Sequence, residues 1–263
     1  MIVAAARVRG VAQPRSVEVD ERAWRVRIDE EQVASSEIAW DVPAIGDVYG
    51  VAFNLQGALD KLGDAVHVAP YLGLPKAPVL YIKPINTWVG SGAQVQQPCD
   101  VQGLRCSGAL GIVIGRAASR VKESEALQFV GGYTVVNDVS VPHENFYRPA
   151  IREKCRDTFC PIGPWVVSAD QVPDPGTLVV KTFINDELMH EARMNALVRS
   201  IPRLIADVSA FMTLAEGDVL LAATAEDAPV ARAGDRVTIE IPGIGRLENR
   251  IVTESEAGLG VVR

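Results

Sequence analysis

Side chains of the types that carry out proton transfer and bind anions gather between residues 138 and 156. Asp138 stands near the end of the apolar run GGYTVVNDVS. A carboxylate in such a strand is costly to bury unless a metal ion, a cation or hydrogen-bond donors hold it. From these residues alone two interpretations remain open: a functional carboxylate, or a strand-end aspartate that accepts backbone N–H groups.

His143 and Glu144 follow this run directly. A neighbouring histidine and carboxylate can supply proton transfer near neutral pH. Residues adjacent in sequence often point apart, so a pair of surface loop residues is the alternative. Thr224, in the segment LAATAED, is a candidate hydrogen-bond donor to a substrate carboxylate.

A cationic loop comes next, with Arg148, Arg152, Lys154 and Arg156. Arginine pairs with carboxylates in a bidentate manner, and lysine acts as a point charge. The alternative interpretation is that these charged side chains form a solvent-exposed face without a ligand. The apolar turn FCPIGPW that follows favours an ordered loop over a core, and an acidic protein that binds a dicarboxylate would need such a cationic patch.

Two strands and a short helix must position these residues. Leu110, Ile112 and Ile114 predict a buried strand that ends at Gly115, and the segment 133–139 predicts a second. The stretch 122–130 predicts a short helix between them.

The remaining chain is rich in strands. Residues 1–46 predict a small N-terminal β annex, and residues 47–263 the main domain. One strong helix is expected to begin after Ser200, its N-cap, to carry an apolar stripe from Ile201 to Met212, and to end near Gly217. The predominance of strands, with few helices between them, argues against a doubly wound α/β fold, and the expected class is a β-rich α+β fold with peripheral helices.

Composition limits the function. The chain has 263 residues, 48% of them hydrophobic, and a formal net charge of −7. This charge argues against nucleic acid or an anionic membrane as a partner. The four cysteines and three histidines form no zinc pattern. No Gly-rich nucleotide motif follows a strand. Without a signal peptide or an apolar span, a cytoplasmic protein is expected.

Several motifs together resemble the fumarylacetoacetate hydrolase superfamily. They are ALGIVIGRA, GGYTVVNDVS and KCRDTFCPIGPWVV, with KPINTWVGSG before them and FMTLAEGDVLLAAT after them. The run from Asn137 to Gly163 is most similar to the N-terminal half of the isomerases/decarboxylases of homoprotocatechuate (4-hydroxyphenylacetate) breakdown. The resemblance implies a mixed β-sandwich roll, a dimer or a hetero-oligomer with a metal-bearing paralogue, and small 2-oxo or dienol acid substrates.

The resemblance also implies a metal site, from which this chain departs. Metal-using members hold Mg²⁺ or a similar hard cation with a Glu-x-Glu pair and the Asp of NDVS. Here Asp138 is retained, but Ser107 and Ala109 stand at the two glutamate positions. Hard cations require oxygen ligands, so no tightly bound cofactor is expected.

The implied activity is tautomerisation of 2-hydroxyhepta-2,4-diene-1,7-dioate, with decarboxylation of 5-oxopent-3-ene-1,2,5-tricarboxylate as an additional activity. Lys154, Glu144 and His143 are the predicted catalytic residues. The predicted substrate-binding residues are Arg148, Arg152, Arg156, Tyr147 and Thr224. Two alternatives stay open: a non-catalytic partner subunit of a metal-bearing paralogue, and an acylpyruvate-type C–C hydrolase.

Overall fold

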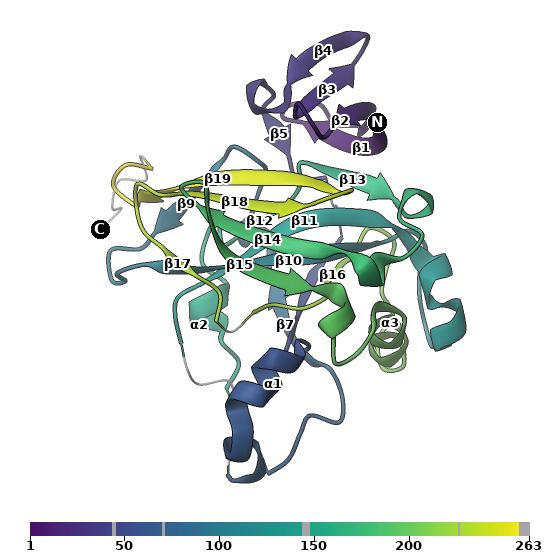
Figure 1. The fold of residues 1–263 in the computed structure, drawn as a ribbon, viewed down its shortest axis with the longest axis vertical. Helices are drawn as coiled ribbons and strands as arrows, with labels where there is room; N and C mark the ends of the chain where they lie inside the picture. Colours follow the sequence, from purple (N-terminus) through teal and green to yellow (C-terminus); the bar gives the residue numbers. More distant parts are fainter. Residues whose placement is uncertain (44–45, 70–71, 144–147, 226, 258–263) are drawn as a thin grey trace.

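Two stacked β-sheets form the body of the protein (Figure 1). The computed structural model describes residues 1–43, 46–69, 72–143, 148–225 and 227–257. None of the described helices is both long and apolar enough to cross a membrane. The predicted β-rich class with peripheral helices is confirmed.

The larger sheet has 12 strands and runs in the order β4-β3-β2-β1-β13-β11-β10-β16-β6-β7, with β17 beside β10 and β5 beside β1. Its strands are β1 (Ile2–Val8), β2 (Arg15–Asp20), β3 (Arg25–Ile28), β4 (Glu31–Ala34), β5 (Trp40–Asp41), β6 (Val48–Ala52), β7 (Val79–Lys83), β10 (Leu104–Ile114), β11 (Val130–Ser140), β13 (Trp165–Ser168), β16 (Val219–Leu221) and β17 (Val230–Ala231).

The second sheet has five strands in the order β15-β14-β18-β19-β9, and a two-stranded sheet pairs β12 with β8. These strands are β8 (Trp88–Val89), β9 (Gln94–Gln97), β12 (Cys160–Pro161), β14 (Val179–Ile184), β15 (Glu187–Arg193), β18 (Arg236–Ile241) and β19 (Gly245–Thr253).

Helices are short and lie at the periphery. The α-helices are α1 (Gln56–Leu62), α2 (Ile151–Lys154) and α3 (Ile201–Ser209). The 3₁₀ helices are Ser35–Glu37, Gly63–His67, Ile85–Thr87, Glu123–Phe129, Ala169–Gln171, Pro175–Thr177 and Met194–Ala196. The helix expected over 122–130 is therefore a 3₁₀ helix. The Ser200 hydroxyl caps α3 by accepting from the Arg203 N–H at 3.4 Å, as predicted.

The N-terminal strands extend the main sheet. In Figure 1, β1 to β5 lie at one end of the molecule and α1 at the other. Strand β1 pairs antiparallel with β13, with Ala4 opposite Val167. Through this pairing the first strands are continuous with the large sheet. The division of the chain at residue 46 into an annex and a main domain stays a prediction.

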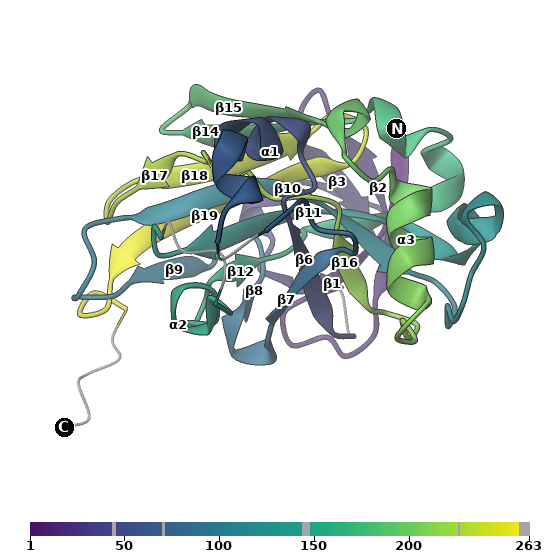
Figure 2. The ribbon, with the colours of Figure 1, turned by 90° about the horizontal axis from the view of Figure 1, so that it is seen from below.

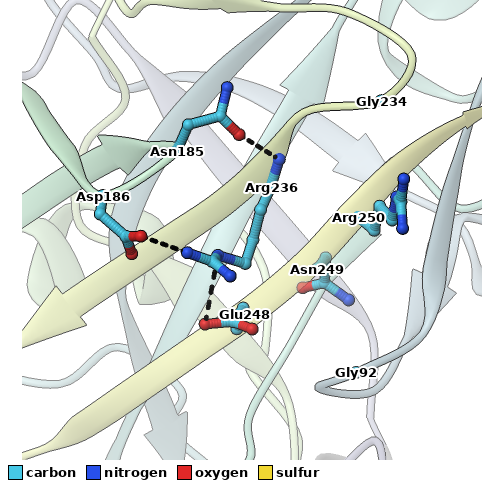
Figure 3. A pocket seen from close by; sticks show the side chains of 8 residues that line it. All are labelled: Gly92, Asn185, Asp186, Gly234, Arg236, Glu248, Asn249 and Arg250. Carbon is cyan, nitrogen blue, oxygen red and sulfur yellow. Dashed lines mark hydrogen bonds and ion pairs between the residues drawn. The ribbon is translucent and has the colours of Figure 1, made fainter.

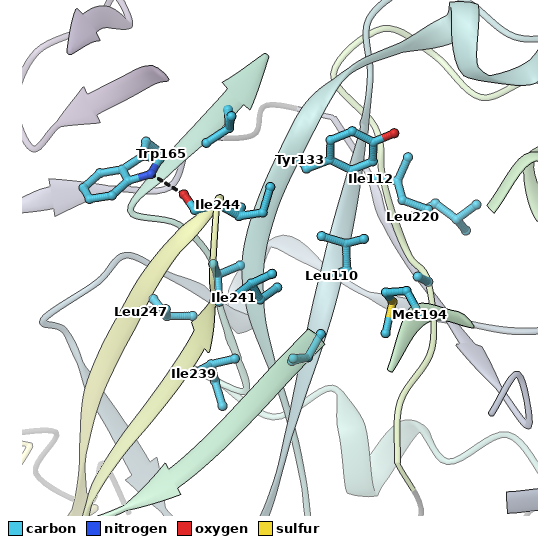
Figure 4. Close-up of a cluster of buried hydrophobic side chains, with 14 of the residues drawn as sticks. Leu110, Ile112, Tyr133, Trp165, Met194, Leu220, Ile239, Ile241, Ile244 and Leu247 are labelled. Carbon is cyan, nitrogen blue, oxygen red and sulfur yellow. Dashed lines mark hydrogen bonds between the residues drawn. The ribbon is translucent and has the colours of Figure 1, made fainter. Parts of the chain in front are cut away.

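The core fills the space between the sheets (Figure 4). Leu110 and Ile112 of β10 and Ile239 of β18 belong to one buried cluster. Gly108 allows the sheets to approach, because a Cβ there would lie 2.8 Å from side-chain atoms of Ile239 and Thr182. Trp165 closes one side, donating its indole N–H to the Ile244 carbonyl at 2.7 Å.

The long antiparallel pair β10–β11 fixes the position of the site. Because side chains alternate along a strand, Leu110 faces the space between the sheets and Ala109 faces the other side. Ser107 lies directly opposite Asp138 and Ala109 opposite Val136. Asp138 therefore projects from the face that carries Ala109 and Val136, away from the five-stranded sheet.

Candidate functional site

Asp138 is the centre of a buried ion cluster. Its side chain is 1% exposed. Lys83 Nζ lies 2.8 Å from Asp138 Oδ1, and Lys154 Nζ lies 2.6 Å from Oδ2. The Asp138 carboxylate is therefore shared between two ammonium groups, one on each of its oxygens.

Lys83 at the end of β7 is fully buried. An ammonium has three hydrogens, and Lys83 directs them at the carbonyl oxygens of Val139, Lys154 and Phe159, at 2.7, 2.9 and 2.8 Å. Its contact with Asp138 is therefore an ion pair without a directed hydrogen bond. Lys83 joins β7, β11 and the end of α2, which sets the position of the Lys154 backbone.

Tyr81 completes the surroundings of Asp138. Its hydroxyl donates to Asp138 Oδ2 at 2.8 Å and lies 3.3 Å from Thr224 Oγ1. Burial, followed by the Asp138 charge, raises the pKa of Tyr81 well above its ordinary value, so the phenol stays a neutral donor. The Lys154 ammonium lies 4.2 Å from the centre of the Tyr81 ring.

Strand pairing explains the orientation of Tyr81. Gly50 of β6 lies opposite Tyr81 of β7. A Cβ at Gly50 would lie 2.0 Å from the tyrosine ring. The glycine therefore lets the ring lie across β6 and reach Asp138.

The charge of Asp138 depends on both lysines. Burial of the carboxyl raises its pKa, but the charges of Lys154 and Lys83 outweigh this effect and lower the pKa to about 2. Asp138 is therefore ionised and both ammonium groups have a permanent counter-ion.

We expect this cluster to make stability pH-dependent in acid. A carboxyl whose pKa is lower in the folded state stabilises the fold above its unfolded pKa of about 4, and this contribution disappears as the pH falls toward the folded value of about 2. The difference corresponds to about 2 kcal/mol. Urea unfolding of the wild type and of Asp138→Asn between pH 5 and pH 2 measures it. The stability gap between the two proteins should narrow as the pH falls, and a constant gap would contradict the assignment.

A small cleft opens beside the cluster. It has a volume of about 30 Å³, which is room for a group of one or two heavy atoms. Its lining residues are Ala52, Arg105, Ser107, Asp138, Ser140, His143, Lys154, Thr224 and Ala225. A larger hollow of about 500 Å³ shares His143 with the cleft and is also lined by Arg148 and Arg152.

The structure brings four of the predicted residues together: Asp138, His143, Lys154 and Thr224 all line the cleft. His143 Nδ1 lies 2.9 Å from the Val141 carbonyl oxygen, which orients the ring. Glu144 and Tyr147, also predicted, lie outside the described residues.

The three predicted arginines are not part of the cleft lining. Arg148 and Arg152 line the neighbouring hollow. Arg156 pairs with Asp100 through two contacts, at 2.7 and 3.1 Å. Arg152 Nη2 also lies 3.4 Å from Asp100. Their role in substrate binding stays a prediction.

The sequence interpretation missed Tyr81, Lys83 and Arg105. The segment VLYIK, residues 79–83, has the pattern of a strand that ends at Pro84. The available signal was that Tyr81 and Lys83, two residues apart on a strand, must share a face. A lysine on an apolar strand needs buried partners, but 55 residues separate it from Asp138 in the chain, so the partner could not be named.

The donors at the implied metal position do not fit a divalent cation. Ala109 has no ligand atom, and Ser107 Oγ accepts from the Ala225 N–H at 2.8 Å. Both Asp138 oxygens contact ammonium groups, which occupy the side where a cation would have to approach. Within the described part of the chain, no group of three His, Cys, Asp or Glu side chains has the arrangement of a metal site.

Another pocket lies on the five-stranded sheet, between β18, β19 and the β14–β15 turn (Figure 3). It has a volume of about 390 Å³. The Arg236 guanidinium in it pairs with Asp186 and lies 3.9 Å from Glu248. Because its charges are largely matched internally, this pocket is a weaker candidate for an anion site than the Asp138 cleft. In Figure 2, β14 and β15 of the five-stranded sheet lie above β10 and β11, and β6 and β7 lie below them.

The fold and the motifs around Asp138 define a class of protein, and comparison with known families identifies it. Residues 47–252 match the model of the fumarylacetoacetate (FAA) hydrolase C-terminal domain. The chain therefore belongs to the fumarylacetoacetate hydrolase family, as the sequence predicted.

Individual relatives agree with this membership. The chain is 37% identical over 231 residues to the 4-hydroxyphenylacetate degradation bifunctional isomerase/decarboxylase of Salmonella dublin, covering 87% of this chain and 52% of that enzyme. It thus spans about half the length of this relative. It is 33% identical over 189 residues to an oxaloacetate tautomerase of Xenopus laevis, covering 68% of this chain and 59% of that one.

A solved structure matches nearly the whole chain. It is a 2-hydroxyhepta-2,4-diene-1,7-dioate isomerase from Mycobacterium marinum, with a TM-score of 0.77 and 27% identity, covering 97% of this chain and 99% of that one. Homologues at this level are named as isomerases and as isomerase/decarboxylases of 4-hydroxyphenylacetate breakdown.

Proposed function

We propose that the chain is a tautomerase of small 2-oxo or dienol dicarboxylic acids, with 2-hydroxyhepta-2,4-diene-1,7-dioate as its substrate. The observation that carries the proposal is the Lys83–Asp138–Lys154 cluster. It fixes the Lys154 ammonium, through a buried carboxylate, in the lining of a cleft that also contains His143. The names of the Mycobacterium marinum structure and of the Xenopus laevis tautomerase support an enol–keto conversion.

The reaction moves one proton. The 2-hydroxyl of the dienol loses its proton and carbon 5 gains one, which converts the dienol to the 2-oxo-3-ene isomer. The dienolate between these two states carries negative charge on the 2-oxygen. Fixed positive charge near that oxygen lowers the barrier, because it needs no reorganisation when the charge develops.

Named residues take the individual roles. The Lys154 ammonium is held at the cleft by Asp138 and stabilises the dienolate oxygen. Thr224 binds a substrate carboxylate. His143 moves the proton, together with Glu144, which lies outside the described residues. No step is assigned to a metal ion, because Ser107 and Ala109 do not supply ligands for one.

Metal independence is the first test. We expect purified chain to convert the dienol at the same rate, within about twofold, with Mg²⁺ or with EDTA. The loss of the dienol's ultraviolet absorbance measures the rate. A matched measurement on a family member with the Glu-x-Glu pair provides the control, because chelation should abolish its activity. A rate that depends on Mg²⁺ would contradict the metal-free site.

A non-catalytic partner subunit is the second candidate. The absence of carboxylates at Ser107 and Ala109 favours this candidate. So does the alignment with the Salmonella dublin enzyme, because this chain covers only 52% of that enzyme's length. In the same assay, a purified chain that is inactive until a metal-bearing paralogue is added supports this candidate.

The proposal has two further parts. The first is decarboxylation of 5-oxopent-3-ene-1,2,5-tricarboxylate, and the second is assembly as a homodimer or with such a paralogue.

A further inference from the structure

Arg105 is an under-satisfied cation in the candidate cleft. It lies on β10 two residues before Ser107, and side chains two apart on a strand share a face. Among the described residues, its side chain makes one long hydrogen bond, from Nη1 to the His143 carbonyl at 3.4 Å. Its Nε is buried without a partner. A guanidinium has five N–H donors in a planar fork, so most of these donors have no acceptor in the part of the chain that the structure describes.

Such an arrangement calls for an anion. A buried donor without a partner destabilises the protein, and a bound acceptor removes this cost. Of the cations that line or underlie the cleft, Lys83 and Lys154 contact Asp138, whereas Arg105 has no carboxylate partner among the described residues. The charge of Arg105 is therefore not offset within the cleft.

Its place on the strand is informative. Arg105, Ser107 and Ala109 point to the same side of β10, and Arg105 lies opposite Ser140 of β11, two residues beyond Asp138. Two residues along a strand span about 7 Å. Arg105 thus lies in the cleft wall beyond the ion cluster. A ligand that binds Lys154 through one polar group can place a second polar group at Arg105.

We propose that Arg105 binds a carboxylate of the substrate and, with Lys154, supplies the anion binding that a metal ion would otherwise provide. The proposal rests on the proposed function and names the specificity-determining residue for the 2-oxo acid. The family pattern has two glutamates on this strand face, which bind a metal cation. This chain has Ser107 and Ala109 at those two positions and the cationic Arg105 on the same face.

Binding of oxalate, a planar dianion that resembles the enolate of a 2-oxo acid, tests this assignment without turnover. Calorimetric titration at 150 mM NaCl should show binding to the wild type. Arg105→Gln should weaken it at least tenfold, since a charge-assisted bidentate contact is lost. Arg105→Lys should give an intermediate loss, because it keeps the charge and loses the fork geometry.

Two controls separate binding from folding. Arg250→Gln removes an exposed arginine of β19, outside the cleft lining, and should leave oxalate affinity within twofold. Thermal unfolding of Arg105→Gln should match the wild type, because Arg105 makes a single long contact. If Arg105→Gln does not fold, the comparison rests on Arg105→Lys.

The outcomes are distinguishable from those for the proposed function. No oxalate binding by the wild type, or equal affinity in the Arg105 variants, would overturn the role of Arg105 while dienol conversion by the wild type could persist. Conversely, a wild type that binds oxalate through Arg105 but converts no dienol would leave the anion site standing and remove the tautomerase.

Discussion

Lys154→Ala is expected to lower kcat for dienol conversion by about 10²–10⁴-fold, with a smaller change in KM. Lys154 is the cation at the cleft surface, 12% exposed and held 2.6 Å from Asp138. Removing a group that stabilises developing negative charge or assists proton transfer has an effect of this size. The initial rate of ultraviolet absorbance loss provides the measurement.

The design of this experiment separates chemistry from folding. Asp138 keeps Lys83 as its partner in the variant, so we expect the protein to remain folded, which circular dichroism checks. Lys122→Ala removes an exposed lysine and serves as the matched control. Lys154→Arg keeps a positive charge and should recover part of the activity. Activity of Lys154→Ala within threefold of the wild type would remove Lys154 from the mechanism.

Lys83→Met is expected to reduce the free energy of unfolding by about 3–5 kcal/mol, the cost of removing one partner from a buried ion pair. Methionine has a similar length and stays apolar, so packing is largely retained. Asp138 would lose one of its two counter-ions, and the carbonyl oxygens of Val139 and Phe159 would lose the ammonium that they share. Urea unfolding at pH 7 measures the difference.

A double-mutant cycle identifies the source of the loss. Asp138→Asn alone removes the carboxylate that both ammonium groups contact, and Lys83→Met in that background removes the fully buried one of these ammonium groups. The two changes should therefore cost less together than the sum of the single changes. Lys76→Met, at an exposed lysine, should change stability by less than about 0.5 kcal/mol. A loss below 1 kcal/mol for Lys83→Met would show that the buried ammonium contributes little to the fold.

Local patterns in the sequence determined which strands exist and which of their faces are buried. The alternation around Leu110 predicted the centre of β10, although the strand begins earlier, at Leu104. The apolar run before Asp138 predicted β11. Asn185 and Asp186 both adopt positive φ values, 51° and 71°, as the hairpin that joins β14 and β15 requires. These features depend on neighbours in the chain, so the sequence carries them directly.

The family motifs determined the first half of the site. They singled out Asp138 and Lys154, and they showed that Ser107 and Ala109 stand where two carboxylates are expected. They did not reveal how Asp138 is compensated. A buried carboxylate that binds no metal ion needs cationic side chains as partners. The motifs identified Lys154 as one such partner but not Lys83.

The tertiary structure decided the rest. Lys83 meets Asp138 because β7 reaches the end of β11, and Tyr81 meets it because Gly50 leaves space across β6. Arg105 enters the cleft because the β10–β11 register places it opposite Ser140. Each contact depends on pairing between strands that are distant in sequence, and this register follows from packing of the whole sheet. The sequence by itself determined the family and the departure from its metal site. Only the fold determined that two lysines contact the one carboxylate that remains and that an arginine lines the same cleft.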